Sequence, residues 1–390
     1  MDEMTRVAII GAGHTRFGRR TDASVQELAF DALREALHDA AIESSAIDGV
    51  AIGSVPEYHQ QRSLSGAVAT YLNLAPCPVW LTEAACGSGG AAIRVGWLAV
   101  RSGVHKVVAV IGCQKMTDLG TAEIQALMGR VGDVQWESRF GTTFPAYYAL
   151  FARRHMHEFG TTPEQLAAIA VKNHGYGVGN PLAMFRKPIT IDKVLSSPMV
   201  ASPLHLFDCC ANADGAACLL LAEERTARAL CPAKPRVFLD GCGAASASMS
   251  VLTAGDLTGV PSTREAARQA YEQAGCTPRD IQVAQLHDGF TITELMAYED
   301  LGFCGRGEGG AFVDGRGPWL HGVVPVNVDG GIKARGHPIG ATGVSMAVEI
   351  VRQLRGDCGD HQVPGASLGL MQNVGGVGQY VFVNVMRREA

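Results

Sequence analysis

"CGSGGAAIRVGWLAVRSG" (residues 86–103) is a glycine-rich turn that opens a helix, and it has a counterpart late in the chain. The counterpart, "GHPIGATGVSMAVEIVRQLRG" (336–356), also begins with glycines and continues as a helix. An apolar, strand-like run follows each helix, at 106–112 and at 366–376. The same order at two distant places indicates that the chain contains two copies of one structural unit.

The segments around these turns extend the repeat. The first half opens with a strand-like run at 6–13, a helical pattern at 24–42 and a strand at 49–55. From residue 235 the order recurs as "PRVFLDGCG", "TREAARQAYEQAG" and "IQVAQLHDG", and each half ends on a further apolar strand. Alternating strands and helices are typical of α/β folds. The sequence therefore predicts an α/β fold of two duplicated βαβαβαββ halves.

A segment of different character interrupts the first half. It is rich in aromatic residues, Met, His and Arg, as in "FPAYYALFARRHMHEF". We expect a first half of residues 1–115 and 205–234, an inserted domain of residues 116–204, and a second half of residues 235–390. Ligands of α/β folds bind beyond the carboxyl ends of the strands. Two halves packed face to face would place Cys86 and His337 at equivalent helix starts, facing one cavity that the insertion covers.

The composition excludes several classes of protein. The chain has 390 residues, 47% apolar and 18% charged, and a net charge of −5 gives no reason to expect nucleic acid or a membrane as partner. The 11 cysteines include no C-x-x-C pair and are typical of reduced thiols. The acidic start is unlike a signal peptide, the end is unlike a peroxisomal address, and no apolar run approaches the roughly 20 residues of a membrane span. We expect a cytoplasmic protein.

Two motifs that suggest other functions have simpler explanations. "IIGAGHTRFG" has Arg16 where the dinucleotide-binding pattern requires its third glycine, so we expect only a turn. His155, His157 and Glu158 in "HMHEF" do not share one face of a helix. A solvated surface is expected there, and no metal site.

Three residues are candidates for catalysis. Most free cysteines are buried and inert. We interpret the adjacent Cys209 and Cys210 as such residues, which pack at the edge of a strand. Cys86 differs because it stands at the glycine turn before a helix. His337 lies between glycine and proline at the corresponding point of the second half. His287 follows the end of a strand, where α/β enzymes carry active-site groups.

Several segments together resemble the thiolases of the sterol-carrier-protein type. "EAACGSGGAAI" resembles the thiolase nucleophile segment, and "GGIKARGHPIGATG" resembles the C-terminal signature. "HDGF" is similar to the H-D-C-F box of this type, and "FRKPITIDKVLSSPMVASPLHLFDCCANADGAACLLL" to its loop and following strand. The resemblance covers essentially the whole chain. It implies a five-layer αβαβα arrangement with an inserted loop domain.

The resemblance also implies a reaction, in which a 3-oxoacyl-CoA and CoA give two acyl-CoAs through an acyl-cysteine. Cys86 would be the nucleophile, with a pKa lowered by the helix dipole, and His337 the base that takes its proton. His287 and His337 would bind the thioester oxygen of the enolate. The backbone N–H groups of Cys86 and Gly375 would bind the acyl-enzyme oxygen.

Coenzyme A is then a cosubstrate, and no tightly bound cofactor is implied. Arg186 and Lys187 in the insertion are candidates for contacts with its phosphates. Relatives of this type often pair with a small OB-fold, zinc-ribbon protein. We expect a homodimer core formed through an edge strand at 106–112, and a heterotetramer or larger assembly if such a subunit joins it.

The chain departs from the thiolase pattern at one catalytic position. Ordinary thiolases protonate the enolate with a second cysteine, where this chain has Asn373, and the H-D-C-F cysteine is replaced by Gly289. An amide does not transfer protons near neutral pH. His287, a bound water or, more remotely, Cys304 is left for this step, unless the substrate makes strong acid catalysis unnecessary. The missing side chain at Gly289 enlarges the pocket and favours a bulky acyl group, either aromatic, branched or from a steroid side chain.

Two further functions are open at this point. A thiolase-fold carbon–carbon lyase, such as a retro-aldolase, or another acyltransferase could use the same fold with an OB-fold partner. A non-catalytic scaffold subunit would need no intact Cys86, His287 and His337. The three retained residues favour a thiolase of a catabolic pathway.

Overall fold

A nine-stranded sheet forms the centre of the protein. The computed structural model describes residues 5–74, 76–232 and 234–389 and has the strand order β3-β2-β4-β7-β1-β8-β11-β10-β9. Residues 1–4 and 390 lie outside the described residues. The expectations about targeting signals at the two ends of the chain fall on these residues. In the part of the chain that the structure describes, no helix is long and apolar enough to cross a bilayer.

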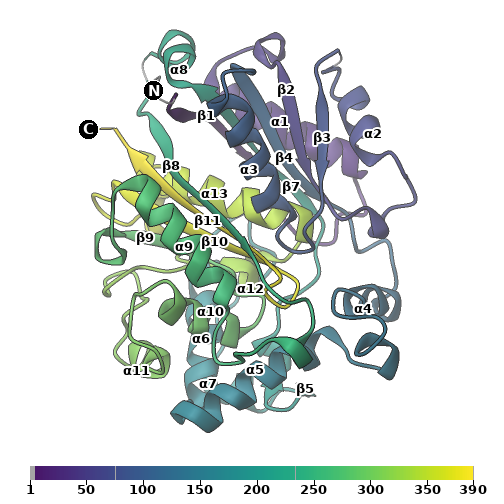
Figure 1. Cartoon of the computed structure of the whole chain (residues 1–390), viewed down its shortest axis with the longest axis vertical. Helices are drawn as coiled ribbons and strands as arrows, with labels where there is room; N and C mark the ends of the chain where they lie inside the picture. The colour runs from purple at the N-terminus through teal and green to yellow at the C-terminus, as the bar shows by residue number, and fades with distance from the viewer. Residues whose placement is uncertain (1–4, 75, 233, 390) are drawn as a thin grey trace.

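The first half supplies one side of this sheet (Figure 1). Its elements are β1 (Val7–His14), α1 (Val25–Ala40), β2 (Gly49–Gly53), α2 (Leu64–Tyr71), β3 (Val79–Thr82), α3 (Ser88–Arg101), β4 (Val107–Gln114), β7 (Gly215–Glu223) and α8 (Glu224–Leu230). A capping box starts α1, because Ser24 accepts from the N–H of Glu27 and the Glu27 side chain returns to Ser24. The buried Leu and Ala face of α1 then packs on β1 and β7.

The second half repeats the first with one strand shortened. Its elements are β8 (Val237–Ser246), α9 (Pro261–Ala274), β9 (Val283–Leu286), α10 (Thr291–Asp300), α11 (Gly309–Asp314), α12 (Gly331–Arg335), α13 (Ile339–Arg355), β10 (Leu368–Gly375) and β11 (Tyr380–Arg388). The counterpart of β3 is only a bridge between Ala284 and Val326. The two halves join where β1 pairs antiparallel with β8. The predicted α/β fold of two related halves is confirmed.

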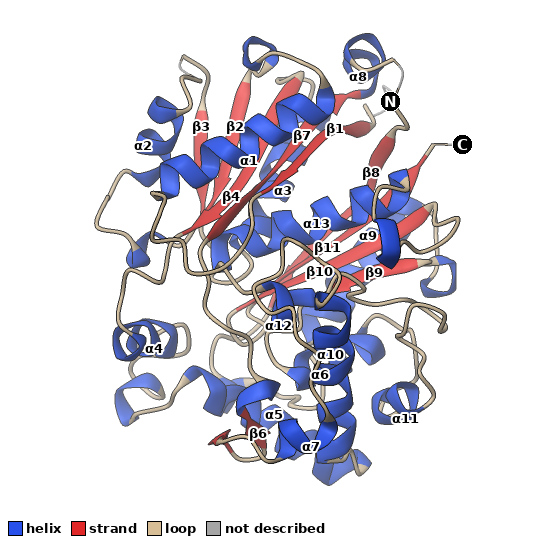
Figure 2. Cartoon of the chain, turned by 180° about the vertical axis from the view of Figure 1, so that it is seen from behind, coloured by secondary structure: helices blue, strands red, loops and turns tan. Residues whose placement is uncertain are grey.

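Helices cover both groups of strands and also fill the space between them (Figure 2). The outer layers contain α1 on the first half and α9 on the second, and α3 and α13 form the middle layer. Nearly all of α13 is buried. A Cβ atom at Gly89 of α3 would lie 2.8 Å from the backbone nitrogen of Gly343 of α13. Only glycines therefore allow these two helices to cross so closely.

The insertion forms a helical group at one end of the molecule, the lower end in Figure 1. Its elements are α4 (Thr121–Gly129), α5 (Phe144–Phe159), α6 (Pro163–Gly177), α7 (Ile191–Leu195) and the short strands β5 (Met199–Ala201) and β6 (Leu204–His205). Helix α6 contacts α10, α11 and α12 of the second half. The insertion is thereby held against the second half, and the domain boundaries given above stay a prediction.

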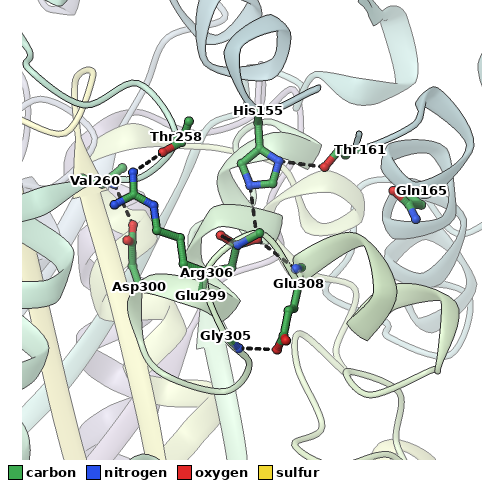
Figure 3. Close-up of polar contacts among 12 residues, drawn as sticks. His155, Thr161, Gln165, Thr258, Val260, Glu299, Asp300, Gly305, Arg306 and Glu308 are labelled. Atoms are coloured by element: carbon green, nitrogen blue, oxygen red, sulfur yellow. Dashed lines mark hydrogen bonds and ion pairs between the residues drawn. The ribbon is translucent and has the colours of Figure 1, made fainter. Parts of the chain in front are cut away.

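One histidine of the insertion is not where the sequence pattern placed it. His155 of α5 is fully buried, so the predicted solvated surface is wrong for this residue. Figure 3 shows its ring between Thr161, 2.7 Å from Nδ1, and Glu299 of α10, 3.1 Å from Nε2. The Glu299 carboxylate also accepts from the backbone N–H groups of Gly307 and Gly309. His155 therefore ties α5 to α10, while His157 is exposed, as predicted.

The edge strand of the first half also differs from the prediction. The run at 106–112 becomes β4, which is buried and paired on both sides, with β2 and β7. Strand β4 is therefore not an edge strand. The sequence did not reveal this, because the order of strands in a sheet depends on contacts between distant segments and not on apolar character. The free edge is β3, whose residues are all half-buried and which pairs only with β2 among the described strands.

Candidate active site

Cys86 lies in a tight turn directly before the middle-layer helix α3. The turn places Ala85 in the left-handed region, with φ of 50°. Ser88 closes it, since its hydroxyl donates to the carbonyl of Ala85 (2.7 Å) and accepts from the N–H of Ala84 (3.0 Å). The Cys86 side chain is only 4% exposed.

The protonation of Cys86 differs from the expectation. Burial raises the pKa of the thiol to about 12, although the backbone N–H of Gly376 and its own N–H stabilise the thiolate. The expected lowering by the helix dipole is therefore wrong for the free protein, because loss of hydration outweighs these contacts. Cys86 is a neutral thiol at neutral pH and requires a base.

His337 is placed to be that base. It is buried and follows Gly336, whose φ of 101° suits glycine. Nδ1 of His337 lies 2.8 Å from the hydroxyl of Thr342, which donates its proton to the carbonyl of Pro338. With the single hydroxyl proton directed to Pro338, Nδ1 of His337 is assigned as the donor to Thr342. Nε2 therefore keeps its lone pair and can accept a proton.

His287 has the opposite tautomer, which Asn373 of β10 determines. The Asn373 side-chain oxygen accepts from the N–H of Gly90 (3.1 Å), so its nitrogen is directed to the carbonyl of Cys86 (3.0 Å) and to Nδ1 of His287 (3.3 Å). An amide nitrogen only donates, so Nδ1 accepts and Nε2 carries the proton. A Cβ atom at Gly289 would lie 3.2 Å from this Nε2. The protonated nitrogen thus faces the space left by the absent side chain.

The three predicted residues form one cluster. A ring nitrogen of each histidine and the Cys86 sulfur lie within 4.8 Å of one another, and the two rings are 5.2 Å apart. Burial lowers the pKa of His287 to about 3 and that of His337 well below its usual value. Cysteine and histidine also bind zinc, but ligation through Nε2 of His287 would move its proton to Nδ1, against the donor group of Asn373. The arrangement favours proton transfer and oxyanion binding over metal binding.

Gly375, at the end of β10, packs against the turn that carries Cys86. A Cβ atom there would overlap the carbonyl oxygen of Ala84 and lie 3.1 Å from the nitrogen of Gly87. The next N–H, of Gly376, interacts with the Cys86 thiol. Backbone donors therefore surround the sulfur, and the assignment of the Cys86 and Gly375 N–H groups to an oxyanion hole stays a prediction.

Two cavities lie on either side of the cluster and share Met128 and Phe144 of the insertion. A cavity of about 310 Å³ lies on the Cys86 side. Its apolar lining also includes Val55, Tyr58, Leu127, Val131, Met249 and Ile339. A smaller cavity of about 150 Å³ lies on the histidine side. Its lining includes both histidines, Gly289, Phe290, Cys209 and Cys210.

Cys209 and Cys210 differ from the prediction of packing alone, because both line the smaller cavity. Neither lies in a named strand, although Cys209 forms an isolated bridge with Phe290. No local sequence pattern reveals this position, but the fold explains it. They come shortly before β7, which runs antiparallel to β4, so its start lies at the carboxyl end of β4. Residues at that edge of an α/β sheet are candidates for the site.

The sequence analysis also missed Asp288, whose carboxylate joins the segment of His287 to the helix that precedes His337. The Asp288 carboxylate accepts from the N–H groups of Ile332 (2.7 Å) and Lys333 (3.0 Å) and from the side chain of Asn173 (2.8 Å). Asp288 is fully buried and directly follows His287. It holds α12, which ends two residues before His337, in a fixed place.

The structure leaves three candidates away from the cluster. Arg186 and Lys187 are exposed, and neither is among the described residues that line the two cavities. Their contact with CoA stays a prediction. Cys304, just after α10, also lines neither cavity, so it is not a candidate for proton transfer to a substrate bound there.

The family models match both halves of the chain. "Thiolase, N-terminal domain" matches residues 7–225, and "Thiolase C-terminal domain-like" matches residues 243–388. The chain belongs to the thiolase family. The boundary between the two matches falls close to β8, where the second half begins.

Curated relatives extend the assignment over the full length of this thiolase. Acetyl-CoA acetyltransferase of Methanothermobacter thermautotrophicus is 41% identical over 388 residues, covering 99% of this chain and 100% of that protein. Benzoylsuccinyl-CoA thiolase subunit BbsB of Thauera aromatica is 36% identical and covers 96% of this chain and 95% of that subunit. Human sterol carrier protein 2 is 32% identical, covering 98% of this chain and 72% of that protein. The chain is an acyltransferase of the thiolase family, of the sterol-carrier-protein type.

A solved structure named "Ltp2-ChsH2(DUF35) aldolase" has the same fold. It superposes with a TM-score of 0.85 and 28% sequence identity, and it covers 99% of this chain and 98% of that chain. A protein of the same architecture is therefore named for a different carbon–carbon bond reaction.

Proposed function

We propose that this thiolase cleaves a 3-oxoacyl-CoA with CoA into two acyl-CoAs through an acyl group on Cys86. The observation that carries the proposal is the set of ring-nitrogen contacts that assign opposite tautomers to the two histidines beside the sulfur. His337 offers a lone pair on Nε2, and His287 offers a proton on Nε2. Thiolysis needs one base and one oxyanion donor at this place.

In the first step His337 takes the proton of Cys86, and the sulfur attacks the 3-keto carbon. The thiol pKa, raised by burial, makes this transfer simultaneous with attack rather than complete before it. His337 then carries a proton on Nε2 and becomes a second donor beside His287. The two N–H groups would stabilise the oxygen of the departing thioester enolate. Loss of one such donor typically costs about 2.7–4 kcal/mol of barrier.

The cavities support an assignment of the two ends of the substrate. The thioester must lie on the histidine side, so the acyl group would occupy the larger cavity on the Cys86 side. Its apolar and aromatic lining, with Tyr58 and Phe144, suits a bulky acyl group better than an acetyl group. A relative named as a benzoylsuccinyl-CoA thiolase subunit supports an aromatic acyl group. We propose that the reaction runs in the catabolic direction, in the cytoplasm.

A retro-aldolase is the second candidate, because a solved relative is named as an aldolase. Such a reaction forms no acyl-cysteine. Cys86→Ser would therefore abolish thiolysis but leave retro-aldol cleavage. The retained Cys86, with a base beside it, favours the thiolase.

We further propose a homodimer that pairs through β3. The carbonyls of Pro78 and Thr82 accept from the N–H groups of Val50 in β2 and of Ser54 just after it. By alternation, Val79 and Leu81 direct their backbone groups to the free edge. A small second subunit with an OB fold and zinc ribbon is consistent with two relatives, one named as a subunit and one as a DUF35 complex. It would join the dimer as a heterotetramer or larger assembly.

The direct test is mass spectrometry of the protein incubated with a 3-oxoacyl-CoA in the absence of CoA. An acyl adduct should appear on the peptide that contains Cys86 and disappear on addition of CoA. Turnover without an adduct on this peptide would rule out the thiolase mechanism.

A further inference from the structure

The proposed reaction lacks a proton donor for the enolate carbon. His287 is poorly suited to donate, because burial lowers its pKa to about 3 and leaves it neutral. A neutral imidazole that gives up its remaining proton becomes an imidazolate, which is a very strong base. Asn373 transfers no proton, and Cys304 lines neither cavity. A bound water or a different group on the histidine side is left for this step.

The structure places one further thiol on that side. Cys210 lines the smaller cavity together with His287, His337 and Gly289. Its backbone N–H donates to the carbonyl of Gly289 at 2.9 Å, so the two positions are direct neighbours in space. Gly289 is the position at which related thiolases of this type carry a cysteine. The cavity therefore has no thiol at Gly289, but the thiol-bearing residue Cys210 lies directly beside that position.

The thiol of Cys210 is available, unlike that of its neighbour. The Cys209 sulfur lies 3.5 Å from the carbonyl oxygen of His205, to which it donates. Among the described residues, no hydrogen bond to the Cys210 sulfur is found. Burial raises the pKa of the Cys210 thiol, against the opposing effect of the Lys333 charge, and a negative charge on the nearby Cys86 would raise it further. It is thus a neutral thiol at neutral pH, which is the form that a proton donor needs.

We infer that Cys210 is the acid and base that acts on the α-carbon of the acyl-CoA, in place of the cysteine absent at Gly289. When the carbon–carbon bond breaks, its electron pair goes to the enolate, and the S–H proton of Cys210 moves to the α-carbon. The incoming CoA thiol, whose pKa as a free thiol is about 8.5, releases its proton to water, and the Cys210 thiolate recovers a proton from water. The CoA sulfur attacks the acyl group, and the departing Cys86 thiolate recovers its proton from His337. The thiols therefore return to their starting state.

The inference rests on the proposed function. Two partial reactions allow the role of Cys210 to be tested separately from the role of Cys86. Acetyl transfer from acetyl-CoA to isotopically labelled CoA requires Cys86 and no carbon–carbon chemistry. Incorporation of deuterium from D2O at C2 of acetyl-CoA requires the acid and base. Cys210→Ser preserves the size of the side chain, and Cys304→Ser is the matched control, a half-buried cysteine outside both cavities.

C210S should lower deuterium incorporation by roughly 10²–10⁴-fold, the usual contribution of a general acid or base, while acetyl transfer stays close to the wild-type rate. C304S should leave both rates unchanged. Near-normal deuterium incorporation in C210S would overturn the inference and leave the thiolase proposal intact. Loss of both reactions would mean a structural role and would also overturn it. A wild-type protein that forms no adduct on Cys86 would instead remove the proposed function.

Discussion

The side-chain nitrogen of Asn373 lies 3.3 Å from Nδ1 of His287. The resemblance to thiolases would place Asn373 where ordinary thiolases have a catalytic cysteine, yet its contacts give it a different task. It fixes the proton of His287 on the nitrogen that faces the cavity. A residue that moves no proton itself can therefore decide where the proton of its neighbour lies.

Asn373→Asp should reverse this tautomer. A carboxylate only accepts, so Nδ1 of His287 would carry the proton and Nε2 would lose it. With one oxyanion donor gone, kcat should fall by roughly 10²–10³-fold. Nitrogen NMR of His287 and steady-state kinetics on the same sample would check both changes. Normal kcat with a protonated Nδ1 would contradict the role given to His287.

Cys86→Ser and His337→Ala should not have additive effects. His337 acts on the substrate through the proton of Cys86, so each substitution disables the same unit. The double variant should be about as slow as the slower single variant in thiolysis. A much lower rate in the double variant would mean that the two residues act independently.

The reactivity of Cys86 should report its raised pKa. Burial raises the thiol pKa to about 12, so the thiolate fraction keeps increasing with pH throughout the range from 7 to 10. Carbamidomethylation of the Cys86 peptide should accelerate across this range, whereas a free cysteine levels off as pH passes its pKa of about 8.5. A plateau below pH 8 would instead indicate a standing ion pair with His337.

The crossing of α3 and α13 should not tolerate a methyl group. A Cβ atom at Gly343 would overlap the Asn373 side chain and the backbone of Gly90. Gly343→Ala should lower the free energy of unfolding by about 1–3 kcal/mol, as overpacking does, and should also reduce thiolysis. Gly175→Ala, near the end of α6, is the control, since no atom lies within 4 Å of its Cβ position. Equal stability of both variants by chemical denaturation would show that the crossing is not tight.

The purified chain should have the mass of a dimer by light scattering. Leu81→Pro removes a backbone donor from the free edge of β3 and leaves the carbonyl contacts of Pro78 and Thr82 in place. This variant should be monomeric with unchanged circular dichroism. A wild-type monomer with full activity would refute pairing at this edge.

The duplicated order of strands and helices could be predicted from the sequence because it depends on local patterns of apolar residues and glycines. The same holds for Cys86 and His337, which stand at corresponding points of two similar segments. The position of β4 between two strands could not be predicted, since pairing joins segments about a hundred residues apart. Cys210 was missed for the same reason, because only the folded chain brings it beside Gly289.

The middle layer separates two kinds of evolutionary change. The helices that start beside Cys86 and His337 are enclosed by both halves, so substitutions there alter the chemistry and the stability together. Met128 and Phe144, which line both cavities, belong to the insertion and lie outside that layer. Substitutions in the insertion can thus adapt the cavities to a new acyl group without changing the packing of α3 against α13. Such modularity would let one scaffold serve an acetyltransferase, an aromatic thiolase and an aldolase among its relatives.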